Sequence, residues 1–239
     1  MCLEDKFNSF SRRAPYPYCM AICIIPARGN SKRLPGKNLL TFHGKPLVQI
    51  AAETAVSAGC FSKVIVSSED SNILAATMNI PGVFNSKRPE ILSGDNVRAD
   101  DVIRWEISRV SLEDDSIYCC LLPTTPLLSP KILAEAASRY TDGVLFGVIP
   151  TSETPYRSFV LEPSSGKLDA LHPEMLTLQS QDYPQTVVDA GQFYFARAQI
   201  WNQNFSITAC KNATGFVLNP KLAIDINYPL DWDKLIQNS

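Results

Sequence analysis

A basic segment near the start of the sequence gathers the residue types that bind a polyphosphate. Residues 26–38 read PARGNSKRLPGKN and hold four cations within ten residues. Gly29 and Gly36 allow the backbone to approach an anion closely, and Ser31 and Asn38 add neutral hydrogen-bond donors. The charge of a polyphosphate must be neutralised before a nucleophile can approach it, and this composition supplies the positive charge that is needed. The segment therefore predicts a polyphosphate site.

The spacing within this segment excludes two common phosphate loops. Gly29 and Gly36 are separated by six residues, more than in the Walker A pattern G-x-x-x-x-G-K-[ST], and Asn38 stands where that pattern has Ser or Thr. The dinucleotide-binding pattern G-x-G-x-x-G is also absent from the sequence. An arbitrary charge run would be interpreted as an exposed basic loop, but the position after the first predicted strand favours an anion site of another type.

Apolar runs that alternate with helical patterns supply the elements that must position this segment. Residues 21–25 (AICII) form a continuous apolar run, which is typical of a central strand buried on both faces of a parallel sheet. The alternation predicts an α/β fold, in which helices cover both faces of a mostly parallel sheet. The predicted strands are 21–25, 64–66, 117–122, 144–149, 191–195 and 222–226, and the predicted helices are 47–58, 100–110, 131–140, a short helix around Trp201, and 230–236. Ligands bind such sheets at the carboxyl ends of the strands, where the basic segment must lie.

The chain length and the proline pattern predict one domain with a small insertion. Four prolines interrupt the alternation between about residues 150 and 188, which we interpret as an inserted lobe in a domain of residues 21–239. Residues 1–20 place acids before bases and lack the apolar core of a secretory signal. We expect them to be a poorly ordered leader.

The composition excludes several classes of protein. The chain has 239 residues, of which 45% are apolar and 19% charged, so it is not a disordered protein. A formal net charge of -2 is too balanced for binding to nucleic acid or a membrane by bulk electrostatics. No apolar stretch approaches the ~20 residues of a membrane span. Seven cysteines, an odd number without a C-x-x-C pair, favour reduced thiols and a cytoplasmic protein.

The run IPARGNSKRLPGKN resembles the signature of the cytidylyltransferases that activate nonulosonic acids (sialic, pseudaminic and legionaminic acids) and the related acid Kdo. The resemblance extends from about Ala21 to the C-terminus, and within the family it is strongest to the pseudaminic acid enzymes, through the run DAGQFY at residues 189–194. Further matching runs are IVSSED at 65–70, KRPE at 87–90, LLPTTPL at 121–127 and IDIN at 224–227. The resemblance implies a Rossmann-like nucleotidyltransferase fold and a homodimer formed through the lobe.

The resemblance also implies a reaction, in which CTP and a nonulosonic acid, most closely pseudaminic acid, give the CMP-sugar and pyrophosphate. It assigns catalytic roles to Arg28, Lys32 and Asp225. The implied nucleotide-binding residues are Ala27, Arg28, Gly29, Asn30, Ser31, Lys32, Lys37, Asn38 and Arg88.

Asp225 matches the metal-binding aspartate of the family, and Mg²⁺ is the expected ion because it takes oxygen ligands and bridges phosphates. The family usually has a second carboxylate two residues later, where this sequence has Asn227. An amide oxygen can ligate Mg²⁺ but carries no charge. We therefore expect Asp225 and Asn227 to be the metal ligands.

Several departures from the family pattern bear on the sugar. Leu122 stands where the sialic acid enzymes have a glutamine, Gln179 where the family often has an arginine, and Val188 where the pseudaminic group often has a histidine. The expected sugar contacts are Arg157, Gln181, Asp182, Asp189 and Gln192. Three alternatives stay open: a sialic, legionaminic or Kdo synthetase, a transferase that uses another nucleotide such as UTP, and a relative that binds nucleotide or sugar without turnover.

Overall fold

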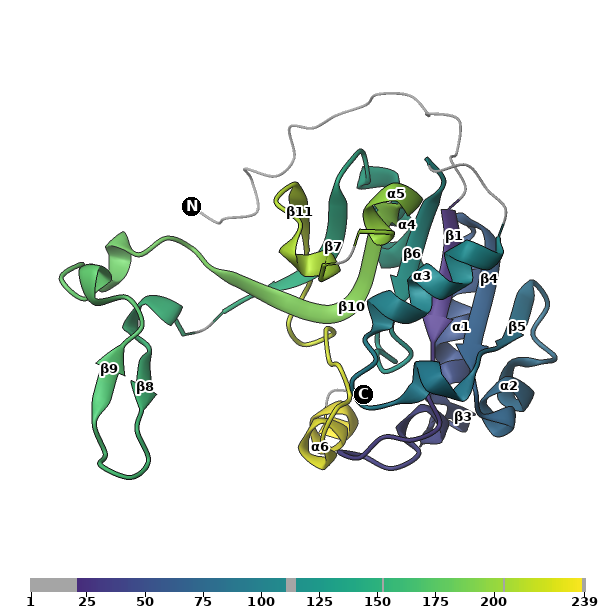
Figure 1. Cartoon of the computed structure of the whole chain (residues 1–239), viewed down its shortest axis with the longest axis horizontal. Helices are drawn as coiled ribbons and strands as arrows, with labels where there is room; N and C mark the ends of the chain where they lie inside the picture. Colours follow the sequence, from purple (N-terminus) through teal and green to yellow (C-terminus); the bar gives the residue numbers. More distant parts are fainter. Residues whose placement is uncertain (1–20, 111–114, 152, 204, 238–239) are drawn as a thin grey trace.

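A seven-stranded sheet forms the centre of the molecule in the computed structural model, which describes residues 21–110, 115–151, 153–203 and 205–237 (Figure 1). The expected leader, residues 1–20, lies outside the described residues. No helix in the described ranges combines the length and the apolar character needed to cross a membrane.

The strand order in the sheet is β11-β7-β10-β6-β1-β4-β5. The strands are β1 (Ala21–Pro26), β4 (Phe61–Ser68), β5 (Val83–Lys87), β6 (Ile117–Leu121), β7 (Val144–Pro150), β10 (Val187–Arg197) and β11 (Ala213–Val217). Their pairing is parallel except for β10, which runs antiparallel to both β6 and β7. The predicted α/β architecture with a mostly parallel sheet is confirmed.

Helices cover both faces of the sheet, as the continuous apolar run of β1 predicts. Cys23 and Ile25 face one apolar cluster, which includes residues of α1 (Leu47–Ala58) and α4 (Pro130–Arg139). Ile22 and Ile24 face a second cluster, with residues of α3 (Ala99–Arg109) and α5 (Ala198–Trp201). Successive strand residues point to opposite faces, so a strand between two helical layers must be apolar at every position.

Two short hairpins lie outside the main sheet. The first, β2 (Thr41–Phe42) with β3 (Lys45–Pro46), precedes α1. The second, β8 (Phe159–Leu161) with β9 (Leu168–Ala170), belongs to the segment between β7 and β10 that we interpreted as an inserted lobe. Figure 1 shows this segment projecting away from the sheet, with the hairpin at its far end.

The predicted strand at 222–226 is wrong, because no β-strand includes these residues. The segment is held instead by backbone contacts from Leu222 and Ala223 to the Asn219 carbonyl and from the Ile226 N–H to the Thr124 carbonyl at 3.0 Å. The Ile226 side chain is also buried among Phe42, Leu47 and Leu235. The apolar residues therefore mark a buried connection into α6 (Pro229–Gln237), which matches the predicted terminal helix.

Besides the strands of the two hairpins, two strands of the main sheet and one α-helix were not predicted. The strands β5 and β11 lie at the two edges of the sheet, where most of their side chains are exposed and the apolar signal is weak. The helix α2 (Ser71–Thr77) is short, and it begins where the Asp70 carboxylate accepts a hydrogen bond from the Asn72 N–H at 2.7 Å.

Candidate active site

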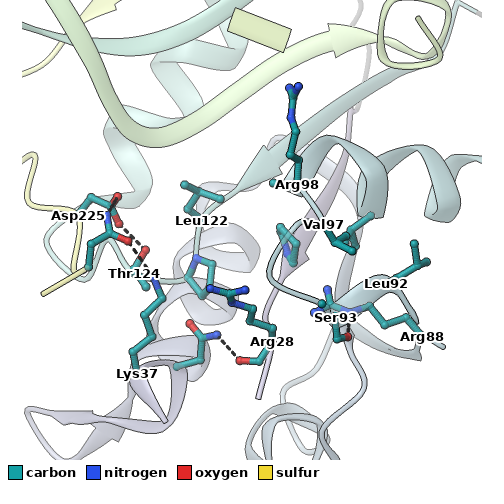
Figure 2. Close-up of a pocket in the computed structure, with 17 residues that line it drawn as sticks. Arg28, Lys37, Arg88, Leu92, Ser93, Val97, Arg98, Leu122, Thr124 and Asp225 are labelled. Carbon is teal, nitrogen blue, oxygen red and sulfur yellow. Dashed lines mark hydrogen bonds between the residues drawn. The ribbon is translucent and has the colours of Figure 1, made fainter. Parts of the chain in front are cut away.

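A cavity of about 150 Å³ lies beyond the carboxyl ends of β1, β4 and β6 (Figure 2). This is where the sheet topology predicts a ligand site. The cavity is lined by residues from β1 and the segment after it, from the segment between β5 and α3, from the start of α3, from the segment after β6 and from the segment before α6. They are Pro26, Arg28, Lys37, Asn38, Arg88, Leu92, Ser93, Gly94, Val97, Arg98, Ala99, Val102, Leu122, Pro123, Thr124, Asp225 and Asn227.

Of the two cations expected to be catalytic in the basic segment, the structure places one in the cavity. Arg28 lines the cavity, whereas the side chain of Lys32 is 81% exposed and lies outside the lining. Both side chains face the carboxylate of Asp95, at 3.6 Å from Arg28 Nη1 and 2.5 Å from Lys32 Nζ. Because the Lys32–Asp95 pair is exposed to solvent, its contribution to stability is small.

The backbone of the basic segment is fixed by a contact with a residue after β4 and by a contact within the segment itself. The Gly29 N–H donates to Glu69 Oε1 at 2.7 Å, and Asn38 Nδ2 donates to the Arg28 carbonyl at 2.8 Å. A side chain at Gly29 would place its Cβ 2.5 Å from Asp70 Oδ2, so only glycine fits here. Sequence reasoning gave Glu69 no role, although it belongs to the matching run at 65–70.

The remaining neutral residues of the segment divide between buried and exposed positions. Ala27, Ser31 and Asn38 are buried, whereas Asn30 is exposed. Within the described part of the chain, Ser31 Oγ and Asn38 Oδ1 are buried without a hydrogen-bond partner. Of these four residues, only Asn38 lines the cavity.

Lys37 connects the basic segment to the segment before α6. Its Nζ donates to Asn227 Oδ1 at 3.0 Å and to the Ile226 carbonyl at 3.2 Å. Arg33 donates to the same Asn227 oxygen at 3.1 Å. Burial lowers the pKa of Lys37, and the nearby Asp225 carboxylate opposes that shift. Lys37 is thus a positive charge held inside the cavity.

Asp225 lies on the same side of the cavity and is held by neutral groups. Thr124 Oγ1 donates to its Oδ1, and Asn227 Nδ2 donates to its Oδ2, each at 2.5 Å (Figure 2 draws the first contact). Burial raises the pKa of Asp225, while the Thr124 hydrogen bond and the charge of Lys37 oppose the shift. Thr124 was missed because it lies 101 residues from Asp225 in the sequence.

Arg88 forms part of the cavity wall, but its guanidinium is committed to the protein. It is 4% exposed and donates to Ser93 Oγ, to the Ser67 carbonyl and to Glu69 Oε2, at 3.1, 3.2 and 2.9 Å. Glu69 therefore contacts both Arg88 and the Gly29 backbone. Arg88 is therefore a fixed group in the wall of the cavity.

The expected sugar contacts do not gather at this cavity within one chain. Arg157, Gln181 and Asp182 lie in the projecting segment, on exposed short helical turns. Asp189 is exposed and accepts hydrogen bonds from the Tyr194 hydroxyl and the Gly191 N–H.

Gln192, which was expected to contact the sugar, does not line the larger cavity. Its side chain is 1% exposed and lines a separate cavity of about 10 Å³, with Leu128, Leu218 and other apolar residues. The register of β10 with β7 is irregular between Asp189 and Tyr194, so simple alternation does not hold at Gln192, and its side chain faces the smaller cavity and lies outside the lining of the larger one. A cavity residue that sequence reasoning missed is Arg98, at the start of α3.

Asp225 is the carboxylate that the expected Mg²⁺ site would use. The described residues contain no group of three or more His, Cys, Asp or Glu side chains that could hold a metal. The oxygen of Asn227 faces Lys37 and Arg33, so the expectation that it ligates the metal with Asp225 does not match this arrangement. A single carboxylate fits Mg²⁺ where phosphate oxygens and water complete the octahedron.

A family model described as "Cytidylyltransferase" matches residues 22–157. A pseudaminic acid cytidylyltransferase from Campylobacter jejuni subsp. jejuni serotype O:2 is 32% identical over 86% of this chain and 90% of that protein. The N-acylneuraminate cytidylyltransferase A of Danio rerio is 30% identical over 87% of this chain and 48% of that protein.

Solved structures show a similar fold. A CMP:2-keto-3-deoxy-manno-octonic acid synthetase complexed with CTP has a TM-score of 0.62 at 18% identity, covering 91% of this chain and 98% of that chain. A 4-diphosphocytidyl-2C-methyl-D-erythritol synthase has a TM-score of 0.64 at 12% identity, covering 91% of this chain and 97% of that chain. At these identities the likeness establishes the fold alone.

Proposed function

We propose, because the chain belongs to the cytidylyltransferase family, that it joins the CMP part of CTP to the anomeric hydroxyl of a nonulosonic acid and releases pyrophosphate. The observation that carries the proposal is the convergence of Arg28, Lys37 and Asp225 on one cavity at the carboxyl ends of the sheet strands. Two cations and one acid are what a transfer at a triphosphate needs, since charge must be neutralised and the reacting groups must be held in line.

The lining of the cavity suggests how CTP lies in it. Leu92 and Val97 lie beside Ser93, on the side away from Asp225 in Figure 2, and Val102 adds to the apolar lining of the cavity. A pyrimidine ring is flat and largely apolar on its faces, so it suits this wall, with its polar edge toward Ser93. The triphosphate then extends toward Arg28 and Lys37.

The transfer itself is a displacement at the α-phosphorus. The oxygen of the sugar hydroxyl forms a bond to the α-phosphorus, the bond to the oxygen that bridges to the β-phosphate breaks, and its electron pair leaves with pyrophosphate. The hydroxyl proton is released on the Asp225 side of the cavity. Lys37 and Arg28 stabilise the charge that develops on the phosphate oxygens and the leaving group.

Asp225 is the residue that would hold Mg²⁺, with Thr124 orienting its carboxylate through the hydrogen bond at Oδ1. When bound, the ion would neutralise phosphate charge and lower the pKa of an oxygen that it coordinates. The neutral contacts of Asp225 leave its charge available for a cation, which supports this assignment.

Pseudaminic acid is the sugar that the relatives favour. Proteins named pseudaminic acid cytidylyltransferase from Campylobacter jejuni and a bifunctional relative from Helicobacter pylori are 32% identical to this chain over 86% of its length. Leu122 lines the cavity near Asp225, so an apolar contact replaces a polar one at the sugar end. This suits a deoxy sugar better than a fully hydroxylated one.

A homodimer is also proposed, on the exposed apolar surface of the projecting segment. Large apolar side chains are exposed there on one face of the β8–β9 hairpin, on the turns that follow and at the start of β10; they are Phe159, Leu161, Leu168, Leu171, Leu176, Leu178, Val187 and Val188. Such a concentration marks an interaction surface. A second copy would cover it and could bring Arg157, Gln181 or Asp182 to a neighbouring cavity.

Pyrophosphate release tests the activity. The purified chain is mixed with Mg²⁺, one of the four nucleoside triphosphates, and pseudaminic, legionaminic or N-acetylneuraminic acid or Kdo. We expect release with CTP and pseudaminic acid and at least ten-fold slower release with the other pairs. A rise in melting temperature with CTP, without pyrophosphate release from any pair, would instead indicate a nucleotide-binding protein. Faster release with another sugar acid would change the substrate assignment.

A further inference from the structure

The proposed reaction brings two separate anions to one cavity, and each needs its own positive charge. The triphosphate carries several negative charges, and the sugar acid carries a carboxylate on the carbon that bears the attacking hydroxyl. A group that binds this carboxylate therefore also orients the nucleophile. The cations that line the cavity are Arg28, Lys37, Arg88 and Arg98.

Two of these cations are held in place by protein groups. Arg88 donates to Ser67, Glu69 and Ser93 and is buried, so it cannot turn toward a second ligand. Lys37 is held by Asn227 and the Ile226 carbonyl beside Asp225, which places its charge where the phosphates react. Arg28 and Arg98 are left with donors to spare.

Arg28 and Arg98 lie on different walls of the cavity. Arg28 comes from the basic segment after β1, next to Asn38, at the triphosphate side. Arg98 precedes the first residue of α3, and Figure 2 shows its side chain extending away from Arg28, Ser93 and Arg88. Its guanidinium thus points away from the base wall and from the phosphate cations.

The surroundings of Arg98 leave its guanidinium accessible. Its side chain is 49% exposed, and Nη2 pairs with Asp100, the second residue of α3. Within the described ranges, no acceptor meets its Nε or Nη1. Leu122 lines the same cavity and packs against the cluster that contains Ile103 of α3, so Arg98 and Leu122 lie on one face of the sheet.

We propose that Arg98 binds the carboxylate of the sugar acid and thereby orients its anomeric hydroxyl toward the α-phosphorus. This assignment rests on the proposed function. It means that each chain binds the carboxylate of its substrate with a residue of its own. A guanidinium presents two parallel N–H donors that match the two oxygens of a carboxylate. Arg157, in the projecting segment, lies outside the cavity lining and does not provide this charge within one chain.

The test combines a change in the protein with a change in the substrate. Wild type, R98Q and R98K are assayed for pyrophosphate release with the sugar acid and with its neutral C1 amide. In wild type we expect kcat/KM for the acid to exceed that for the amide by about 10- to 100-fold, as for a charge-assisted bidentate pair. R98Q should remove most of this preference by slowing the acid alone, and R98K should restore part of it. The KM for CTP should change by less than about two-fold.

R109Q is the matched control, because Arg109 lies on the same helix, exposed and stacked on Trp105, outside the cavity lining. The R109Q variant should keep the wild-type preference for the sugar acid over its C1 amide. R98K also keeps a positive charge beside Asp100, so it remains informative if R98Q folds poorly. Equal slowing of acid and amide in R98Q, or weaker CTP binding in place of weaker acid binding, would overturn the assignment of Arg98 alone. No pyrophosphate release from wild type with any sugar acid would overturn the proposed function and the assignment with it.

Discussion

Asp225 is a partly buried carboxylate whose two hydrogen-bonding side chains, Thr124 and Asn227, are both neutral. Burial disfavours its charged form and raises its pKa. A divalent cation placed against this group would offset that cost, and Lys37, which already donates to Asn227 and Ile226, supplies part of the compensation. The site therefore couples metal binding to the ionisation of one residue.

Replacing Asp225 by Asn tests this coupling. The amide can still accept from Thr124, but it carries no charge for Mg²⁺, so we expect pyrophosphate release to fall by about 10²-fold or more. CTP binding measured in EDTA should be retained, since a negative charge near the triphosphate is removed. Asp233→Asn, on the exposed side of α6, is the control and should leave both quantities unchanged. Normal Mg²⁺-dependent turnover in Asp225→Asn would contradict the assignment.

Gly191 leaves room for the Asp225 side chain. Its φ is +60°, and a Cβ there would lie 2.8 Å from Asp225 Oδ2. Gly191→Ala should cost about 1 kcal/mol in the free energy of unfolding and also displace the carboxylate, which lowers Mg²⁺-dependent turnover. Gly166→Ala meets the same backbone penalty at φ +72°, with no atom within 4 Å of the new Cβ. Urea unfolding should report a similar loss in both variants, and turnover should fall only in the first; a matching fall in both would refute the steric role.

Sequence reasoning located the cavity residues that belong to recognisable runs and missed those that act across long separations. Arg28, Lys37, Asn38 and Asp225 line the cavity as the motif implied. The pairing of Lys32 with Asp95 was not predictable, because an exposed side chain takes the nearest opposite charge in space. Arg98 was not predicted as a site residue, because a single arginine before a helix forms no recognisable sequence motif.

At the scale of elements, α4 has a start that the sequence specifies locally. Ser129 Oγ accepts a hydrogen bond from the Ile132 N–H at 3.3 Å, and Pro130 occupies the first helical position. Leu133 and Ala136 on its buried face then pack in the cluster that includes Leu121 of β6. The end of β6 leads directly into the cavity wall, so the stability of α4 supports the site.

Ser129→Ala should therefore lower the free energy of unfolding by about 1 kcal/mol, the usual cost of an N-cap hydrogen bond. Urea denaturation followed by circular dichroism measures the change. Ser138→Ala is the matched control, because Ser138 is exposed within the last turns of the same helix and donates only to the Glu135 carbonyl. Alanine is favoured there, so that variant should be neutral or slightly stabilised. An equal loss in both would show that the cap contributes nothing.

The elements that sequence reasoning found are those with a strong buried pattern. Continuous apolar runs identified β1, β4, β6 and β7, because strands between two helical layers bury both faces. The same rule failed at residues 222–226, where apolar side chains are buried by a third cluster, around Phe42 and Leu235, without any ladder partner. The pattern of apolar residues in a sequence indicates which side chains are buried. It does not indicate whether the backbone pairs with a neighbouring strand.

At the scale of the molecule, the sheet and the projecting segment differ in how they expose apolar side chains. The sheet buries its apolar residues between two helical layers, whereas the β8–β9 hairpin exposes them. An isolated two-stranded hairpin is marginally stable in water. The register of the β8–β9 hairpin places Leu161 opposite Leu168, so an apolar patch forms on one face of the hairpin. A second surface packed against this face would bury the patch. A second copy of the chain is the partner that we propose.

The dimer can be tested by charging one face of the hairpin and not the other. Leu161→Lys with Leu168→Lys places two like charges opposite one another on the apolar face, while Val160→Lys changes the other face of the same strand. Light scattering after size exclusion should give the mass of a dimer for wild type and for Val160→Lys, and a monomer for the double variant. Circular dichroism should show that the main sheet persists in all three, because the hairpin lies outside it. A monomeric wild type, or a double variant that stays dimeric, would show that this face does not join two copies, and the residues of the projecting segment would then have no route to a neighbouring cavity.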